Sequence, residues 1–206
     1  MKKKLQRFVR LINIFLFKKE LPEKISLYFH NIDDVTLESI KQLIRIFKYQ
    51  GYKFVSISEF NNHLNDDSKK LVALSFDDGF ATWKNLLDFF EEHEVIVTFF
   101  INSIIFTNEE KSSYLRKIGS YKLEDLISTD DLQLLANSSH EIGAHTHNHD
   151  ICKSLSIDEF KKDIELNLEI FKKFGIKPSS FAIPFGMRRY IDKNQVLILK
   201  EYFKVI

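Results

Sequence analysis

The sequence predicts an α/β domain built on a parallel sheet, and two observations carry this prediction. Short runs rich in β-branched and aromatic residues alternate with segments of helical periodicity, which is the pattern of helices that connect parallel strands. Seven such runs fall within residues 25–206. So many strands in a short chain favour a small or distorted barrel over an open doubly wound sheet, although periodicity alone does not separate the two.

The predicted strands are short and mostly apolar. In chain order they are Ile25–Phe29, Lys53–Ser56, Leu71–Phe76, Ile96–Ile101, Glu141–Ala144, Ser180–Ile183 and Phe203–Ile206. In an α/β domain of this kind, functional side chains gather at the carboxyl ends of the strands. The residues that follow each strand are therefore the first place to look for chemistry.

Three helices between these strands have recognisable start or stop signals. Apolar residues at three- and four-residue intervals predict a helix that ends before Gly51; they are Leu37, Ile40, Leu43, Ile44 and Phe47. Ser156 begins a capping box for a helix that Gly175 closes. Thr129, followed by two acidic residues, predicts another helix start. Residues 103–126 have the least regular pattern, which predicts a loop over one end of the barrel.

The composition is that of a globular protein with one main domain. Its 206 residues are 44% hydrophobic and 29% charged, with only 6 Gly and 3 Pro, which excludes a disordered or collagen-like chain. Cys152 is the single cysteine, so the chain is no disulfide scaffold. The longest uncharged run, Val95–Asn108, has 14 residues, fewer than the ~20 that span a membrane.

The charge of the chain is divided unevenly. Residues 1–20 carry a net charge of +6, and the remaining 186 residues sum to −5. A mildly acidic body lacks the basic face of a general nucleic-acid-binding protein, so we expect no nucleic-acid partner. We predict a basic amphipathic segment at residues 1–24, followed by the main domain at residues 25–206.

The basic segment has three interpretations. Four apolar residues share one face of a helix that is otherwise basic, which suits contact with an anionic membrane surface: Leu5, Phe8, Ile12 and Phe15. The segment also resembles a poor secretory signal, since Arg10 interrupts its apolar run and no small-residue cleavage site follows. A terminal helix packed on its own domain is the third interpretation. The packed terminal helix ranks slightly ahead of peripheral membrane contact through residues 1–20, and the poor signal ranks last. We favour a cytoplasmic or membrane-peripheral location, with a secreted or periplasmic location as the alternative.

The first polar group follows the strand Leu71–Phe76. Asp77 and Asp78 leave this strand together and precede Gly79. Two adjacent carboxylates resist joint ionisation unless a cation lies nearby, but Asp-Asp-Gly is also a common turn. These residues alone are compatible with a turn or with a metal or catalytic site.

The second polar group follows the strand Glu141–Ala144. Three histidines fall within five residues there, at His145, His147 and His149. One helical turn would bring the first and last to one face, whereas an extended chain would align all three. Imidazoles are common ligands of zinc and related metals, and two imidazoles with one carboxylate leave a position for water, as in catalytic metal sites. No histidine follows His149, which argues against amidohydrolase-like barrels.

Three motifs in order now point to a known family. Ser75–Gly79 matches Thr/Ser-Phe-Asp-Asp-Gly, His145–His149 matches His-Ser/Thr-x-x-His, and Ala182–Gly186 matches part of Arg-x-Pro-Tyr/Phe-Gly. With these motifs the chain resembles the polysaccharide deacetylases of carbohydrate esterase family 4, the NodB-homology domain. The resemblance implies a distorted (β/α)7 barrel and a metal-dependent enzyme. The implied reaction hydrolyses the acetamido group of an N-acetylated sugar in a glycan and releases acetate.

The resemblance also implies a role for each motif residue. It makes Asp77 the general base, and Asp78, His145 and His149 the ligands of a divalent metal. Zinc is the expected metal, with cobalt, nickel or iron as alternatives that the same ligands accept. His147 is not a motif position, so we treat it as a neighbour of the site.

Two departures from the family pattern affect the expected site. Ala182 stands where the family has an arginine; Arg188 or Arg189 is a candidate replacement, and ordinary surface arginines are the competing interpretation. The later motifs, which end in a histidine, are missing. A circularly permuted branch that includes poly-N-acetylglucosamine deacetylases carries that histidine near its start, and Leu27–His30 resembles its first strand. We therefore expect a circularly permuted barrel with His30 as the catalytic proton donor.

Several residues beside the motifs are expected to contact the sugar. We assign substrate binding to Pro184, Phe185, Gly186 and Tyr28. Phe80 and Trp83 also lie beside a motif, and either a sugar-binding or a core position suits them. Two other functions stay open: a non-catalytic glycan-binding protein with a degenerate site, and an amidase that acts on a non-sugar acyl amide.

Overall fold

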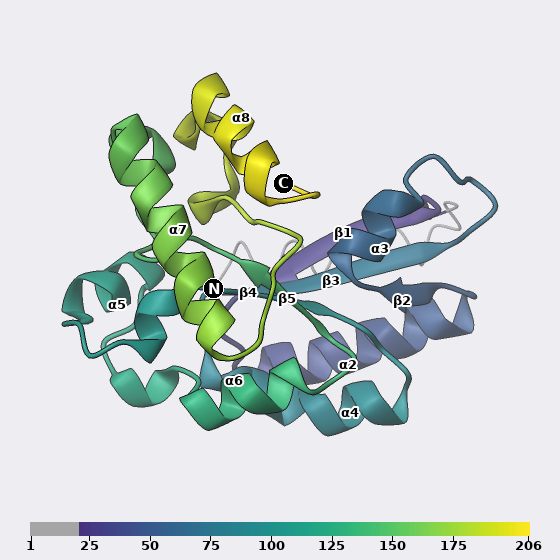
Figure 1. Cartoon of the computed structure of the whole chain (residues 1–206). Helices are drawn as coiled ribbons and strands as arrows, with labels where there is room; N and C mark the ends of the chain where they lie inside the picture. Colours follow the sequence, from purple (N-terminus) through teal and green to yellow (C-terminus); the bar gives the residue numbers. More distant parts are fainter. Residues whose placement is uncertain (1–20) are drawn as a thin grey trace.

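A parallel sheet forms the centre of the domain, and helices cover it (Figure 1). The computed structural model of the chain describes residues 21–206. The strands are β1 (Lys24–Phe29), β2 (Lys53–Val55), β3 (Leu71–Asp77), β4 (Thr98–Ile101) and β5 (Glu141–Ala144). The α-helices are α2 (Asp34–Tyr49), α3 (Ile57–Asn62), α4 (Leu87–Glu92), α5 (Ser112–Ile118), α6 (Thr129–Ala136), α7 (Ile157–Lys173) and α8 (Lys193–Tyr202).

Strand β3 is the middle of the sheet. All six residues of β1 pair with β3. On the other side, β2 pairs with the first half of β3 and β4 pairs with the second half. Strand β5 follows beside β4. Single parallel bridges then join Phe181 to Ala144 and Val205 to Ser180. All these pairings are parallel, and β1 pairs with β3 rather than with β2, which distorts the consecutive order of a (β/α)7 barrel. The predicted fold class, a distorted barrel, is confirmed.

The barrel is distorted because its last two strands are reduced to single bridges. Within residues 21–206, no pairing joins β1 to residues 203–206, so the two ends of the sheet do not meet. Helix α8 runs to Tyr202. Of the predicted strand Phe203–Ile206, one residue, Val205, forms a bridge. Circular permutation stays a prediction.

The prediction of a loop at residues 103–126 is wrong in its middle. Helix α5 forms there, and Gly119 closes it with a φ of 74°, a left-handed conformation that glycine adopts without strain. Tyr114 and Leu115 on this helix are buried against Ile104 and Leu126 in a small separate core. A helix of two turns is too short for its apolar period to be recognised in the sequence.

The predicted helix starts agree with the structure to within one residue. Ser156 caps α7, and its partner in the capping box is Glu159. Helix α6 begins at Thr129, and the residue that caps it is the preceding Ser128, with Asp131 as the partner in its capping box. Within residues 21–206, no helix combines the length and the apolar character that a membrane crossing needs.

The alternation of side chains along β3 decides which face of the sheet carries polar groups. Val72, Leu74 and Phe76 belong to the main core, which also contains residues of α2, α4 and α6, the helices below the sheet in Figure 1. Successive side chains of a strand point to opposite faces. Ser75 and Asp77 therefore point away from this core, toward the interior of the barrel.

His140 links this core to the pH dependence of stability. Its ring packs edge-on against Phe90 and Phe99, its Nδ1 lies 3.4 Å from the backbone nitrogen of Val97, and burial lowers its pKa to about 4. The folded state therefore favours the neutral ring, and the stability this contributes is lost as the pH falls below the unfolded value of about 6.5.

We expect this group to lower the free energy of unfolding by about 2 kcal/mol between pH 7 and pH 5. The His140→Gln variant lacks the titrating ring, so its stability should fall less over the same interval. Urea unfolding of both proteins at the two pH values measures the difference. An equal fall in the two proteins would contradict this account.

Candidate active site

The first part of the site is the turn that follows β3. Asp77 is the last residue of the strand, and Asp78 turns the chain with a φ of 79° while its backbone N–H donates to the Phe100 carbonyl at 3.1 Å. Gly79 has a φ of 67°, and a Cβ there would collide with the side chain of Ile105. This turn places two carboxylates at the carboxyl end of the central strand.

The second part is the loop that follows β5. Thr146 and His149 both have positive φ values, 67° and 56°, and the loop folds back so that the rings of His145 and His149 lie 4.9 Å apart. Asp163 on α7 accepts hydrogen bonds from the backbone N–H groups of His147 and Asn148, at 2.7 and 3.1 Å. The geometry is thus neither of the two predicted from spacing, the helical turn and the extended strand.

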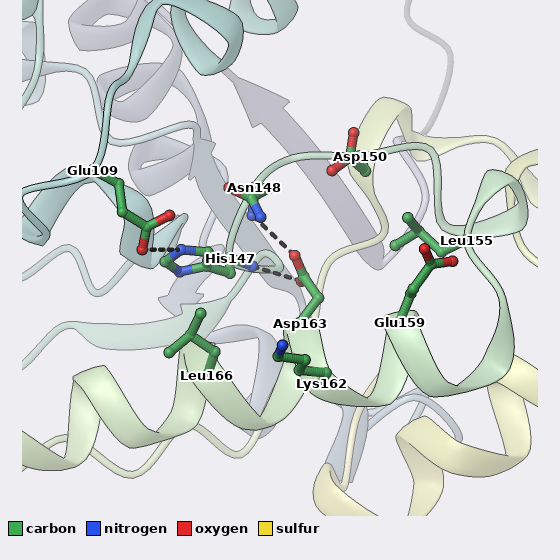
Figure 2. A pocket seen from close by; sticks show the side chains of 9 residues that line it. All are labelled: Glu109, His147, Asn148, Asp150, Leu155, Glu159, Lys162, Asp163 and Leu166. Carbon is green, nitrogen blue, oxygen red and sulfur yellow. Dashed lines mark hydrogen bonds and ion pairs between the residues drawn. The ribbon is translucent and has the colours of Figure 1, made fainter.

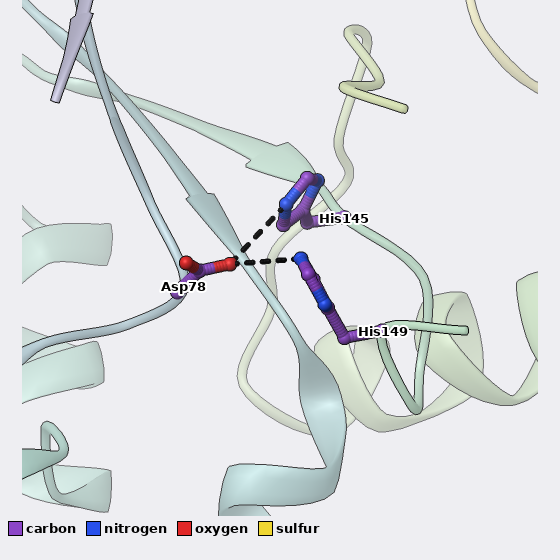
Figure 3. Close-up of side chains that lie close together, drawn as sticks. All are labelled: Asp78, His145 and His149. Atoms are coloured by element: carbon purple, nitrogen blue, oxygen red, sulfur yellow. Dashed lines mark ion pairs between the residues drawn. The ribbon is translucent and has the colours of Figure 1, made fainter. Parts of the chain in front are cut away.

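The two parts meet in a buried group of three side chains (Figure 3). Asp78 Oδ1 lies 3.4 Å from His145 Nε2 and 3.1 Å from His149 Nε2, although it accepts no hydrogen bond. Burial acts to raise the pKa of Asp78, but the two imidazoles outweigh it and hold that pKa well below its usual range. The carboxylate therefore stays ionised in a buried position.

This group fits a divalent metal. One ligand atom from each of Asp78, His145 and His149 lies within 4.8 Å of the others. His145 donates from Nδ1 to the Ala182 carbonyl at 2.8 Å, which leaves Nε2 as the nitrogen that can bind a metal, as in metal-binding histidines. Two nitrogen donors and one oxygen donor suit zinc and its neighbours in the first transition row.

Asp77 is a buried carboxyl group beside the three-residue group. Its Oδ1 is buried and has no hydrogen-bond partner. Burial raises the pKa of Asp77 to about 6, against the opposing influence of the charges on His145 and His30. A carboxylate with a raised pKa and a free oxygen atom is suited to accept a proton.

His30 reaches the site from the N-terminal strand. It follows β1, which ends at Phe29, and its Nε2 lies 3.7 Å from Asp78 Oδ2. Its side chain is 47% exposed, and the indole N–H of Trp83 donates to its backbone carbonyl at 3.1 Å. The structure thus brings His30 to the same centre as the residues of the motifs.

Two of the residues assigned to substrate binding are exposed aromatics beside the site. The ring of Tyr28 lies 5.7 Å from that of His30, and the ring of Phe185 lies 4.7 Å from that of His149. Both side chains are accessible, at 58% and 42%. Gly186 is exposed beside Phe185, whereas Pro184 is buried, so Pro184 shapes the loop from below.

The structure decides two alternatives that the sequence left open for neighbouring residues. Phe80 and Trp83 are buried in the main core, so neither offers a face to a sugar. Arg188 and Arg189 are exposed, and Arg189 donates to the Tyr190 hydroxyl at 2.9 Å. Among residues 21–206, no arginine forms an ion pair with Asp77; the contribution of the third motif is instead the Ala182 carbonyl that holds His145.

His147 faces a different part of the molecule (Figure 2). Its Nδ1 lies 2.8 Å from Ser103 Oγ and its Nε2 lies 3.3 Å from Glu109 Oε1. It lines a cavity of about 350 Å³ next to Asp163, and the cavity contains none of the three residues of the metal group. The assignment of His147 as a neighbour outside the ligand set agrees with this position.

Residues that orient the site were missed in the sequence. Asp163 and Asn167 are buried on α7, and Asn167 donates to the Thr146 carbonyl at 2.8 Å. The signal was a pair of polar residues on the apolar face of a helix, between Phe160 and Phe171. Asn102 and Tyr114 carried no such signal, because Asn102 follows the four-residue strand β4 and Tyr114 lies in the seven-residue helix α5.

Comparison with known proteins supports the family. The polysaccharide deacetylase family matches residues 64–202, a range that includes all three motifs and excludes Tyr28 and His30. No curated relative matches the chain.

Solved structures support the fold. A de-N-acetylase from Aggregatibacter actinomycetemcomitans aligns with a TM-score of 0.66 and 19% identity over 87% of this chain and 85% of that one. A deacetylase domain from Bordetella bronchiseptica aligns with a TM-score of 0.60 and 13% identity over 87% and 84%. A polysaccharide deacetylase from Bacillus cereus aligns with a TM-score of 0.69 and 16% identity, but this chain covers only 56% of it. The three motifs, the barrel and the match over most of the chain lead to one conclusion: the chain belongs to the polysaccharide deacetylase family.

Proposed function

We propose that this protein is a metal-dependent hydrolase that removes the acetyl group from an N-acetylated sugar of a glycan. The observation that carries the proposal is the buried group of Asp78, His145 and His149, with the free Oδ1 of Asp77 beside it. A divalent metal held by these three residues would polarise the acetamide carbonyl and lower the pKa of water. The remaining chemistry is proton transfer, for which Asp77 and His30 are positioned.

Asp77 is the proposed general base. Its free, buried oxygen can accept a proton from the attacking water, and its raised pKa makes it a stronger base than an exposed aspartate. Asp78 cannot take this role, because its two imidazole neighbours hold its pKa well below the usual range. Two adjacent carboxylates thus have different tasks because their surroundings differ.

His30 is the proposed proton donor. Amide hydrolysis requires a proton on the departing nitrogen, because an amide anion is a poor leaving group. The imidazole of His30 is half-exposed and lies 3.7 Å from the carboxylate of Asp78, so it can exchange protons with solvent and still reach the centre. Its proton would go to the nitrogen as the C–N bond breaks, leaving a free amine on the sugar and acetate as the second product.

The acid limb of the pH profile of kcat/KM tests the role of Asp77. A general base acts only when ionised, so on the acid side of its pH profile kcat/KM should fall about tenfold per pH unit below the pKa of Asp77. That pKa is about 6, and a bound cation would lower it further. We expect the acid limb at or below pH 6; a limb well above pH 6 would contradict the assignment.

A substrate panel tests the proposed reaction against the alternatives. Protein loaded with zinc, cobalt, nickel or iron is incubated with N-acetylglucosamine oligomers and with non-sugar acetamides, and released acetate is measured. Release from the oligomers alone supports the proposal, and release from the simple amides would favour an amidase. Bound metal without release from any substrate would favour a glycan-binding protein, which the alanine at position 182 in place of the family's arginine would then explain.

The location of the protein is part of the same proposal. Residues 1–20, for which peripheral membrane contact is one of the three interpretations, lie outside the described residues. We propose that this basic segment brings the deacetylase domain to a membrane surface, in a cytoplasmic or membrane-peripheral location, with N-acetylated glycan or a glycan precursor as its substrate. Vesicles of anionic and of neutral lipid, mixed with the full chain, test this contact by co-sedimentation.

A further inference from the structure

The two loops that carry the metal-binding residues are joined by two buried side chains outside the family motifs. The Tyr114 hydroxyl donates to the Asp78 carbonyl at 2.7 Å and lies 3.3 Å from Asn102 Oδ1. Asn102 Nδ2 donates in turn to the carbonyls of His145 and Thr146. The single hydroxyl proton of Tyr114 is thus shared between two acceptors, with the shorter contact to the Asp78 carbonyl. Through Tyr114 and Asn102, polar contacts connect the turn after β3 with the loop after β5.

These two side chains are fully enclosed. Tyr114 is 1% exposed and Asn102 is 0% exposed. Burial strengthens hydrogen bonds of this kind and makes the loss of any one partner costly, because a buried polar atom without a partner loses its hydration and gains nothing. The connection is thus a rigid link between the loops.

The link ends on strained backbone. Residues 21–206 contain five non-glycine residues with positive φ, and four of them belong to the site: Asp78, Thr146, His149 and Phe185. Such conformations cost free energy and persist only where the surroundings hold them. Two of the carbonyls that accept from the link are those of Asp78 and Thr146, so the link acts where the backbone is strained.

We propose that Tyr114 and Asn102 are positioning residues that hold the Asp78 turn and the His145–His149 loop together for metal binding. Neither side chain is a ligand, and neither contacts the reacting atoms. Loss of either would release a carbonyl of one loop and let that loop relax, which moves Asp78 Oδ1 away from the imidazole nitrogens. The inference rests on the metal site of the proposed function and extends it to residues beyond the motifs.

The test is the affinity of the metal-free protein for Zn²⁺, measured by competition with a chromophoric chelator. The Tyr114→Phe variant keeps the ring and removes the hydroxyl. We expect its dissociation constant for Zn²⁺ to rise by about 10–100-fold, the usual cost of losing a residue that orients a metal ligand. Loss of kcat at saturating substrate should be restored in part by excess Zn²⁺.

A matched control separates positioning from stability. Tyr52 is 3% exposed and its hydroxyl donates to the Pro22 carbonyl at 2.9 Å, so Tyr52→Phe removes an equivalent hydrogen bond far from the metal group. Both variants should lose a few degrees in Tm, about 2–4 °C for each kcal/mol of lost stability. Only Tyr114→Phe should bind Zn²⁺ more weakly.

If Tyr114→Phe does not fold, the Zn²⁺ affinity of the Asn102→Ala variant tests the same inference independently. Because the two side chains act as one link, the double variant should weaken Zn²⁺ binding by less than the product of the single effects. Wild-type affinity in both single variants would overturn the inference. Zinc affinity is measured without substrate, so a protein that binds Zn²⁺ but fails the deacetylation assay would contradict the proposed function and would still test the positioning role of Tyr114 and Asn102. A wild-type protein that binds no Zn²⁺ would overturn both proposals.

Discussion

Replacing Asp78 with alanine is expected to abolish metal binding and deacetylation together. The substitution removes the carboxylate that both imidazoles face, at 3.1 and 3.4 Å, and leaves two neutral donors that hold a metal far more weakly than three. The chemistry that the metal supplies contributes several kcal/mol to the reaction, so activity should fall by at least about 10³-fold.

Elemental analysis of the dialysed protein and acetate release measure the two losses separately. Asp67→Ala, which removes an exposed aspartate from the segment before β3, is the matched control and should keep both metal and activity. An Asp78→Ala protein that retains either a full complement of metal or wild-type turnover would contradict the ligand assignment.

Replacing Asp77 with asparagine should have a different outcome. The side chain keeps its size and the three ligands stay in place, so the protein should bind metal normally. The amide cannot accept the proton of the attacking water, and kcat should fall by about 10²–10⁴-fold, the usual contribution of a general base.

Both quantities come from one preparation of the Asp77→Asn protein, by metal analysis and by initial rates at saturating substrate. The acid limb near pH 6 should also disappear from the residual activity, because the group that titrates is gone. Retained metal with full activity would exclude Asp77 as the base, and loss of metal would show that it is a ligand.

The residues of the centre were predictable because the chemistry lies in short motifs at strand ends. Asp77, Asp78, His145 and His149 follow β3 and β5, and parallel strands that pair or neighbour one another deliver such residues to one edge of the sheet. His30 was predicted from the resemblance of Leu27–His30 to the first strand of the permuted branch, and the structure places it after β1, which pairs with β3. Once the short β-branched and aromatic runs that form these strands are recognised in the sequence, the residues that follow them are recognised as well.

The geometry of the loops was not predictable from spacing. The His145–His149 segment adopts neither the helical nor the extended conformation, because Thr146 and His149 take left-handed backbone conformations that side chains other than glycine seldom adopt. Long-range contacts decide this: Asp163, on α7, holds the loop by two backbone N–H groups. Residues brought together only by tertiary folding leave no local pattern.

The missing arginine of the third motif has a similar explanation. Arg188 and Arg189 were the candidates in the sequence to replace the arginine of the motif, but both side chains lie at the surface. Without an arginine partner, Asp77 keeps a pKa that burial raises, against the opposing charges of His145 and His30. The site is thus expected to depend on the burial of its base rather than on an ion pair, and this distinguishes it from members that carry the arginine.

The central claim is that Asp78, His145 and His149 bind one metal ion that the deacetylation requires. The most direct measurement is a titration of chelator-treated protein with Zn²⁺ and with Co²⁺, in which acetate release from N-acetylglucosamine oligomers is followed at each addition. The account predicts no release from the metal-free protein and a rise that saturates at one metal ion per chain. Release that is independent of added metal, or a protein that binds the metal at this centre and releases no acetate from any N-acetylated glycan, would contradict it.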